Sequence, residues 1–143
     1  MRVAHILRKY NPAEWGGTET ALERLFDGLC PSVTPVIYCP RLKKGCANGT
    51  RDPFTEHGYS LKRFRACVPV WGLSKRERTQ MVSVGGNLFS FDLVPALWRE
   101  PGVAIIHSHA LGRLGGIGLT IAKRRHLPFV VTIHGGFLDL PPA

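Results

Sequence analysis

The stretch that decides the fold is residues 103–136, which read VAIIHSHALGRLGGIGLTIAKRRHLPFVVTIHGG. An apolar strand over Val103–Ser108 is followed by a glycine-rich turn, a helix and a second apolar strand over Phe129–Ile133. A histidine pair ends the first strand, and His134 follows the second. Open α/β sheets hold their ligands just outside the carboxyl ends of parallel strands. We therefore expect the functional site at this edge.

The rest of the chain continues the alternation of strands and helices. Apolar or β-branched runs predict strands, and apolar residues at helical spacing predict helices. The predicted strands are Met1–Arg8, Val33–Cys39 and Tyr59–Ala66, and the predicted helices are Thr18–Cys30 and Asn87–Glu100. Such alternation implies βαβ units with right-handed crossovers. The sequence predicts an α/β, Rossmann-like fold, with a mostly parallel sheet and helices on both faces, in one domain over residues 1–143.

Local signals refine these elements. Thr20–Glu23 has the pattern of a capping box at a helix start. Pro35 argues against a strand at its own position, and Pro95 predicts a helix that is kinked or split. Two stretches, 41–58 and 68–86, show no sustained periodicity and are expected to be long connections.

Composition limits the class of protein. The chain has 143 residues, with 44% hydrophobic and 20% charged residues, as in ordinary globular domains. No apolar run approaches the roughly 18–20 residues of a membrane span, and no signal peptide is recognisable. We expect a cytoplasmic protein. The four cysteines form no C-x-x-C pair, so we expect free thiols.

Positive charge is concentrated in one segment. The net charge is +9, and Arg41–Arg78 contains ten Lys or Arg against three acidic residues. Such a segment attracts nucleic acid, anionic lipid or phosphorylated ligands through the same long-range field. A solvated surface rich in arginine is an equally good interpretation. Peripheral contact with the inner face of a membrane is one expectation from this segment.

A double glycine marks the connection between the first predicted strand and the first helix. Gly16 and Gly17 leave the backbone open to a ligand, and helix amides beyond them, at Thr18 and Glu19, favour an anion. The stretch is neither a G-x-G-x-x-G motif nor a P-loop. Taken alone, it predicts a phosphate cradle or a simple tight turn.

The histidines are the other candidates. His107 and His109 lie two apart in a strand and could chelate a metal, but no third ligand is obvious beyond His134. We therefore predict no metal site, a packed His107, and a His109 that reaches the cleft. His134 is followed by Gly135, which leaves its ring uncovered, so that it could donate to a sugar hydroxyl or transfer a proton.

Four stretches carry a family resemblance. They are MRVAHIL followed by GGTE, then GNLFSFDLVPALWRE, then VAIIHSHA and PFVVTIHGG. In this order they resemble the N-terminal domain of GT-B glycosyltransferases of the large family four, which use nucleotide sugars and retain the anomeric configuration. The resemblance implies the truncated N-terminal half of a GT-B fold.

The resemblance also implies roles for individual residues. The two glycines would approach the donor phosphates or the acceptor, Glu19 and Thr20 would line the acceptor side, and His134 would contact the transferred sugar as the candidate catalytic residue. The candidate substrate-binding residues are Gly16, Gly17, Thr18, Glu19, Thr20, His109 and Gly135. No cofactor is implied, and the donor would be a nucleotide-diphosphate sugar.

In this family a second domain grips the nucleotide, and residues 1–143 contain no such domain. The resemblance thus implies that this chain does not transfer sugar alone and requires that domain or a partner chain. We also predict that Phe129–Ile133 forms an apolar edge strand through which the chain self-associates.

The leading hypothesis is the acceptor-binding portion of a retaining glycosyltransferase in glycan, glycolipid or cell-envelope polysaccharide assembly, acting on a glycan or lipid acceptor. Two alternatives stay open. One is part of a GT-B sugar-nucleotide 2-epimerase. The other is a non-catalytic basic module that binds nucleic acid or an anionic membrane.

Overall fold

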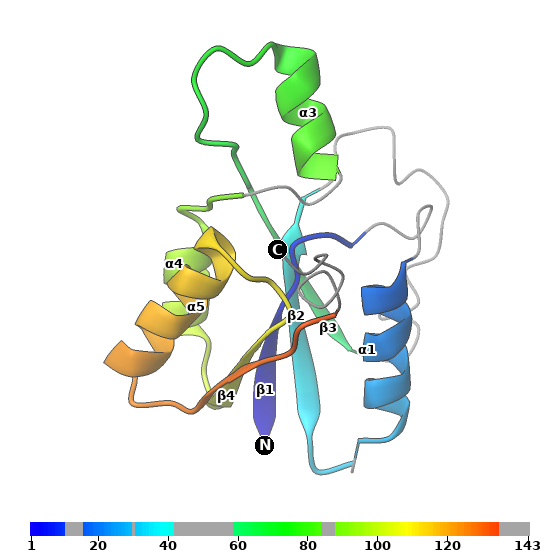
Figure 1. Cartoon of the computed structure of the whole chain (residues 1–143). Coiled ribbons are helices and arrows are strands. Elements are labelled where there is room, and N and C mark those ends of the chain that lie inside the picture. Colours follow the sequence, from blue (N-terminus) through cyan, green and yellow to red (C-terminus); the bar gives the residue numbers. More distant parts are fainter. Residues whose placement is uncertain (11–15, 30, 42–58, 84–87, 135–143) are drawn as a thin grey trace, which may run out of the picture.

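The computed structural model describes residues 1–10, 16–29, 31–41, 59–83 and 88–134. In these residues strands and helices alternate along the chain (Figure 1). The strands are β1 (Arg2–Ile6), β2 (Thr34–Pro40), β3 (Ser60–Phe64), β4 (Val103–Ser108) and β5 (Phe129–Val131). The helices are α1 (Gly17–Asp27), α3 (Lys75–Ser83), α4 (Leu93–Arg99) and α5 (Arg113–Arg124).

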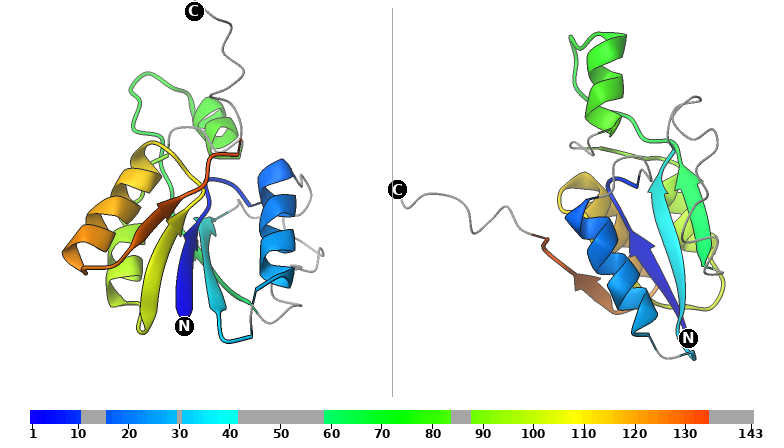
Figure 2. Two further views of the ribbon diagram at one scale, coloured as in Figure 1. Left: turned by 60° about the horizontal axis from the view of Figure 1, so that its bottom comes forward. Right: turned by 90° about the vertical axis from the view of Figure 1, so that its right-hand side faces the viewer.

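The five strands form one parallel sheet in the order β3-β2-β1-β4-β5. Helix α1 covers one face, and α4 and α5 cover the other (Figure 2). The predicted Rossmann-like α/β fold is confirmed. Because the strands are parallel, their carboxyl ends share one edge, the upper edge in Figure 1, and α3 stands beyond it.

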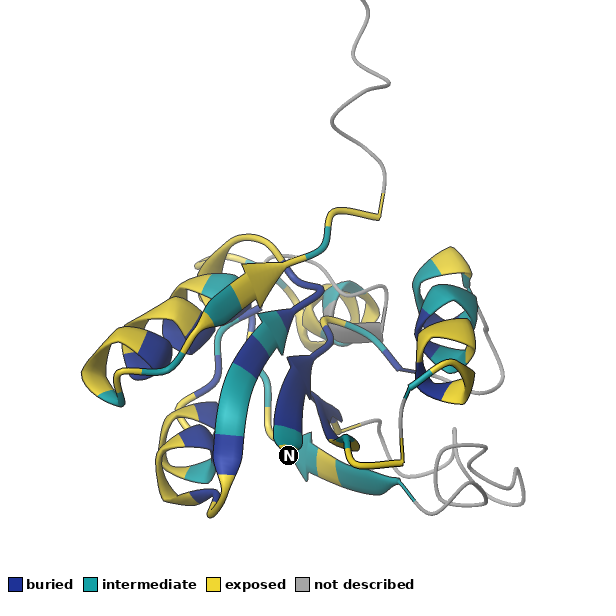
Figure 3. Ribbon diagram, turned by 90° about the horizontal axis from the view of Figure 1, so that it is seen from below, coloured by how far each residue is buried: buried dark blue, intermediate teal, exposed yellow. Residues whose placement is uncertain are grey.

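Each face of the sheet has its own apolar layer. Leu22 and Phe26 of α1 pack with Leu7 and Ile37 on one side. On the other side β1 contributes Ile6 to a larger cluster with α4 and α5. A central strand covered on both faces is apolar at nearly every position, which explains why the start of the chain is apolar from Val3 to Leu7 except at His5. Figure 3 shows this burial in the central strands.

The predicted capping box at Thr20–Glu23 is wrong. Helix α1 begins earlier, at Gly17, and the carboxylate of Glu19 accepts a hydrogen bond from the Gly16 amide at 3.1 Å. The Thr20 hydroxyl donates to the Gly16 carbonyl at 3.1 Å. Gly16 has no side chain, so only the glutamate half of a capping box can form.

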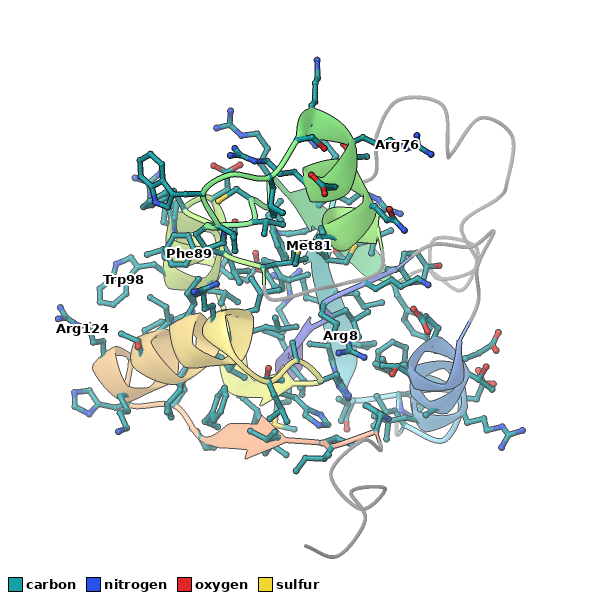
Figure 4. All side chains as sticks on the ribbon, turned by 45° about the horizontal axis from the view of Figure 1, so that its top comes forward. Arg8, Arg76, Met81, Phe89, Trp98 and Arg124 are labelled. Atoms are coloured by element: carbon teal, nitrogen blue, oxygen red, sulfur yellow. The ribbon has the colours of Figure 1, made fainter. Side chains whose placement is uncertain are left out.

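Helix α3 lies in residues 68–86, where no regular structure was expected, so that prediction is wrong. Its first turn has a complete capping box. The Ser74 amide donates to the Glu77 carboxylate at 2.7 Å, and the Glu77 amide donates to the Ser74 hydroxyl at 3.2 Å. Its sequence, KRERTQMVS, is mostly polar, and most of the side chains over residues 75–81 are exposed. Met81 points back toward the core and Arg76 points away (Figure 4).

Both prolines fit without distortion. Pro35 lies in β2 opposite Val3, one position before the pairing of β2 with β3 begins at Val36, so its missing N–H leaves no gap in the ladder. Helix α4 starts at Leu93, which puts Pro95 in the first turn, where the N–H has no helical partner. The predicted kink or split is therefore absent from this helix.

The two edge strands of the described sheet differ in character. Strand β3 carries Lys62 and Arg63, charges of the kind that discourage edge pairing. Strand β5, which ends at Val131 rather than at the predicted Ile133, has the sequence FVV. The edge position of this apolar segment is confirmed, and its self-association stays a prediction. No helix in the described ranges has the length and apolar character needed to cross a membrane.

Candidate functional site

The site is built where β1, β4 and β5 end. The chain leaves β1 toward Arg8, leaves β4 toward His109 and leaves β5 toward His134. The first turn of α1 stands at the same edge (Figures 1 and 4). Parallel pairing thus brings together residues that are more than 100 positions apart in the sequence.

Four histidines form a cluster at this edge. The register pairs His5 of β1 with His107 of β4, so their rings lie side by side, with centroids 5.0 Å apart. His5 Nδ1 is 3.1 Å from His109 Nε2, and His109 Nδ1 is 2.8 Å from His134 Nε2. We call this row of three hydrogen-bonded rings, His5, His109 and His134, the imidazole chain. His107 lies beside it, 2.7 Å from the Thr132 hydroxyl through Nε2.

Burial keeps the cluster uncharged. It lowers the pKa of His5 to about 3, with His107 adding to the shift. Burial and the neighbouring rings lower the pKa of His109 to about 2. Burial also lowers the pKa of His107, and neighbouring His134 acts in the same direction. These rings are therefore neutral at physiological pH, and each carries a single N–H.

Because each ring has a single N–H, the two hydrogen bonds of the imidazole chain must both run in the same direction, either from His5 to His134 or from His134 to His5. If His5 Nδ1 donates to His109, then His109 Nδ1 donates to His134, and His134 is left with an N–H at Nδ1. In the reverse direction His5 would keep an N–H at Nε2, a buried atom with no hydrogen-bond partner among the described residues. Orphaned buried N–H groups are rarer than unmet acceptors. We infer the first direction, in which His134 offers an N–H at the edge.

His134 also has charged neighbours. Burial lowers the pKa of its ring, Arg8 lowers it further, and Glu19 opposes them, which places both charges within electrostatic reach. The ring itself is exposed. Beside Gly17 the space is open, since a Cβ built there would meet no atom within 4 Å. We call Arg8, Gly17, Glu19 and His134 the rim.

The structure brings most of the predicted site residues together. Gly16, Gly17, Thr18, Glu19 and Thr20 form the start of α1, and His109 and His134 lie at the same edge. One prediction is wrong: His109 is buried at 7% exposure, whereas His107, expected to be the packed ring, is only half-buried. His109 follows β4, and its ring stacks against that of His134 with centroids 5.1 Å apart. Gly135 lies outside the described residues.

Sequence reasoning missed His5 and Arg8. His5 lies within an apolar run, where it counts as a strand residue, and only the parallel pairing of β1 with β4 reveals its partner. Arg8 could have been found as the first charged residue beyond a buried strand that leads to a ligand edge.

Comparisons with known proteins give no relative from which a role could be transferred. The chain matches no family model, and no curated protein matches it significantly.

Proposed function

We propose that this chain is the acceptor-side portion of a nucleotide-sugar-dependent retaining glycosyltransferase, and that the rim binds the sugar and diphosphate of its ligand. The observation that supports this most is the exposed His134 ring, held through Nε2 by His109. A fixed neutral imidazole with an N–H at Nδ1 suits a hydroxyl or phosphate oxygen.

The start of α1 supports the phosphate part of the proposal. The backbone N–H groups of a helix's first turn have no intrahelical partner, and they point toward the end of the helix that favours anions. The open space at Gly17 lets an oxygen approach them, and Arg8 adds a positive charge within electrostatic reach of His134. Oriented amides and a fixed cation are the groups that stabilise the charge of a departing diphosphate.

Glu19 supports the sugar part. Its side chain is buried, and one carboxylate oxygen, Oε2, accepts the Gly16 amide. The carboxylate is held in place by this bond and can accept a hydrogen bond from a sugar hydroxyl through its remaining lone pairs.

The test measures binding by NMR, in the presence of a chelator, with UDP-glucose, GDP-mannose and inorganic pyrophosphate as probes. We expect the signals of Gly17, Glu19 and His134 to shift. Gly17→Ala fills the open space, and His134→Asn removes the imidazole. Because hydrogen bonds to charged groups contribute about 1.5–3 kcal/mol, each substitution should weaken binding about tenfold or more.

Gly116→Ala is the matched control. A Cβ at Gly116 also meets nothing within 4 Å, but this glycine lies in α5 and not in the rim. It should leave binding unchanged. The proposal fails if no probe shifts the rim signals, or if Gly17→Ala and Gly116→Ala bind equally well.

A second function, contact with an anionic membrane, is favoured by one observation. Trp71 is 96% exposed and Val70 is 42% exposed, directly before the basic start of α3 with Lys75, Arg76 and Arg78. An exposed tryptophan next to cations suits a lipid interface. Of the basic segment 41–78, residues 42–58 lie outside the described structure.

Co-sedimentation with vesicles tests this second function. Vesicles that contain phosphatidylglycerol should retain the chain, vesicles of phosphatidylcholine alone should not, and Trp71→Ala should reduce retention. Salt-sensitive binding to DNA that is indifferent to Trp71→Ala would instead support a nucleic-acid module.

A further inference from the structure

The same edge holds a group of side chains that would not touch the ligand of the proposed function. One ring nitrogen from each of His5, His107 and His109 lies within 4.8 Å of the others. In the described part of the chain this is the one such group of three among the His, Cys, Asp and Glu side chains. We propose that these three histidines bind a divalent transition-metal ion, with Zn²⁺ as the preferred occupant.

The spacing of one nitrogen pair is close to that required by a tetrahedral ion, and the third nitrogen would have to move inward. Zinc–nitrogen bonds of about 2.0–2.1 Å place two ligand atoms about 3.4 Å apart, and His5 Nδ1 is 3.1 Å from His109 Nε2. At the widest separation within the group, 4.8 Å, the nitrogens would have to close by about 1.4 Å. His107, which is half-buried, is the ring with the most room to move.

A buried ring nitrogen without a hydrogen-bond partner also supports metal binding. His5 is 2% exposed, and its Nε2 atom has no hydrogen-bond partner among the described residues. A buried polar atom without a partner costs free energy. Nδ1, which lies 3.1 Å from His109 Nε2, and Nε2 are alternative ligand atoms of His5, and only ligation through Nε2 would satisfy the buried atom.

Outer contacts already orient the other two rings. The Thr132 hydroxyl holds His107 through Nε2, and His134 holds His109 through Nδ1. Metal-binding histidines are commonly fixed in this way through the second ring nitrogen. The His109 contact leaves Nε2, the nitrogen that faces His5, as the one that can ligate.

The donor set selects the class of ion. Three neutral imidazoles suit Zn²⁺, Cu²⁺ and Ni²⁺, whereas Mg²⁺ and Ca²⁺ require oxygen ligands. Three histidines also leave a fourth tetrahedral position for water or an anion. This inference departs from the sequence prediction of no metal site, which failed to identify His5 as a third ligand.

The test begins with chain stripped by a chelator and titrated calorimetrically with ZnCl₂ or MgCl₂. We expect one Zn²⁺ per chain and no binding of Mg²⁺. Loss of an outer-shell partner alone typically weakens a site 10–100-fold, so His107→Asn should weaken Zn²⁺ binding by at least about 100-fold.

His126→Asn is the matched control. His126 is exposed and follows α5, outside the proposed site, and asparagine tolerates its left-handed backbone conformation, φ 54°. Its zinc affinity should equal that of the unsubstituted chain. Equal affinities of His107→Asn and the unsubstituted chain would overturn the proposal.

X-ray absorption of the zinc-loaded, unsubstituted chain gives a second measurement that does not depend on any variant folding. We expect scattering from three imidazoles. Fewer than three, or no zinc retained after gel filtration, would also overturn the proposal. Because probe binding at the rim is measured with chelator present, failure of the metal site leaves the proposed function standing, and the reverse also holds.

Discussion

At the scale of single residues, Glu100 is the clearest case of a side chain whose chemistry stabilises the fold. It is 5% exposed, and Tyr38 donates to its carboxylate at 2.8 Å. Arg2 pairs with it at 3.2 Å, and Lys62 forms a shorter ion pair. Burial raises the pKa of Glu100, but the bonds from Lys62 and Tyr38 outweigh it, so the pKa lies below its ordinary value.

Replacing Glu100 by Gln should lower the free energy of unfolding by about 2 kcal/mol, because charged hydrogen bonds are lost around a buried site. Urea unfolding at neutral pH measures this. Asp27→Asn, an exposed position at the end of α1, is the control and should change stability by less than about 0.5 kcal/mol. A Glu100→Gln variant as stable as this control would contradict the account.

The sequence predicts the place of a site residue when that place follows from its position at the end of a strand. His134 was predicted at the edge, and it is exposed there. The burial of His109 could not be predicted, because it depends on the rings of His5 in β1 and of His134 beyond β5 that lie against it. Contacts between residues 100 positions apart leave no local pattern in the sequence.

At the scale of elements, the first turn of α5 packs close to the segment that joins it to β4, because Gly115 has no side chain. A Cβ at Gly115 would lie 2.3 Å from the Ala110 carbonyl oxygen, a backbone atom, whereas a Cβ at Gly116 would meet nothing within 4 Å. We expect Gly115→Ala to destabilise the chain by about 2–3 kcal/mol through overpacking. Gly116→Ala should stabilise it by about 0.5–1 kcal/mol through helix propensity.

Thermal unfolding of the two variants measures both effects, and the substitution, glycine to alanine, is the same in each. Equal melting temperatures for Gly115→Ala and Gly116→Ala would show that α5 does not approach Ala110 as described.

Comparison of the predicted and observed elements shows which sequence signals were sufficient to locate a strand or a helix. The strands were predicted to within about two residues. For β1, β2 and β4 the signal is the nearly continuous apolar run of a buried parallel strand. Helix α3 was missed because it buries few side chains, although Ser74 and Glu77 have the spacing of the capping box that forms there. The start of α1 was misplaced because Gly16, which has no capping side chain, precedes it.

At the scale of the whole molecule, stability should depend on pH through the buried histidines. In the unfolded chain His5 and His109 bind protons below a pKa of about 6.5, whereas in the fold their pKa values are about 3 and about 2. Between these limits the unfolded state holds more protons, so the free energy of unfolding falls as the pH falls.

With chelator present, the expected slope is about 1.4 kcal/mol per pH unit for each ring below about pH 6. Urea unfolding between pH 4 and pH 8 measures it. Replacing His109 by Asn should remove one ring's share of the slope, and Gly116→Ala, which changes no titratable group, should leave the slope unchanged. A stability that is flat from pH 8 to pH 4.5 would contradict the burial of these rings.

The exposed edge at β5 leads to a second prediction for the whole molecule. Val130 and Val131 are each 43% exposed at an edge strand without charges. We expect two copies to pair there, so the sedimentation-average mass should rise with concentration, and Val131→Lys should keep the chain monomeric. A mass that does not change with concentration in the unsubstituted chain would refute the pairing.

The central claim is that an imidazole chain from His5 through His109 fixes His134 at the carboxyl edge and presents its N–H there. Long-range ¹⁵N–¹H NMR of the histidine rings in metal-free protein near pH 7 tests this directly, because it distinguishes protonated from unprotonated ring nitrogens. The account predicts a proton on Nδ1 and none on Nε2 of His134, with His5 unprotonated at Nε2. A proton on Nε2 of either His5 or His134 would contradict it.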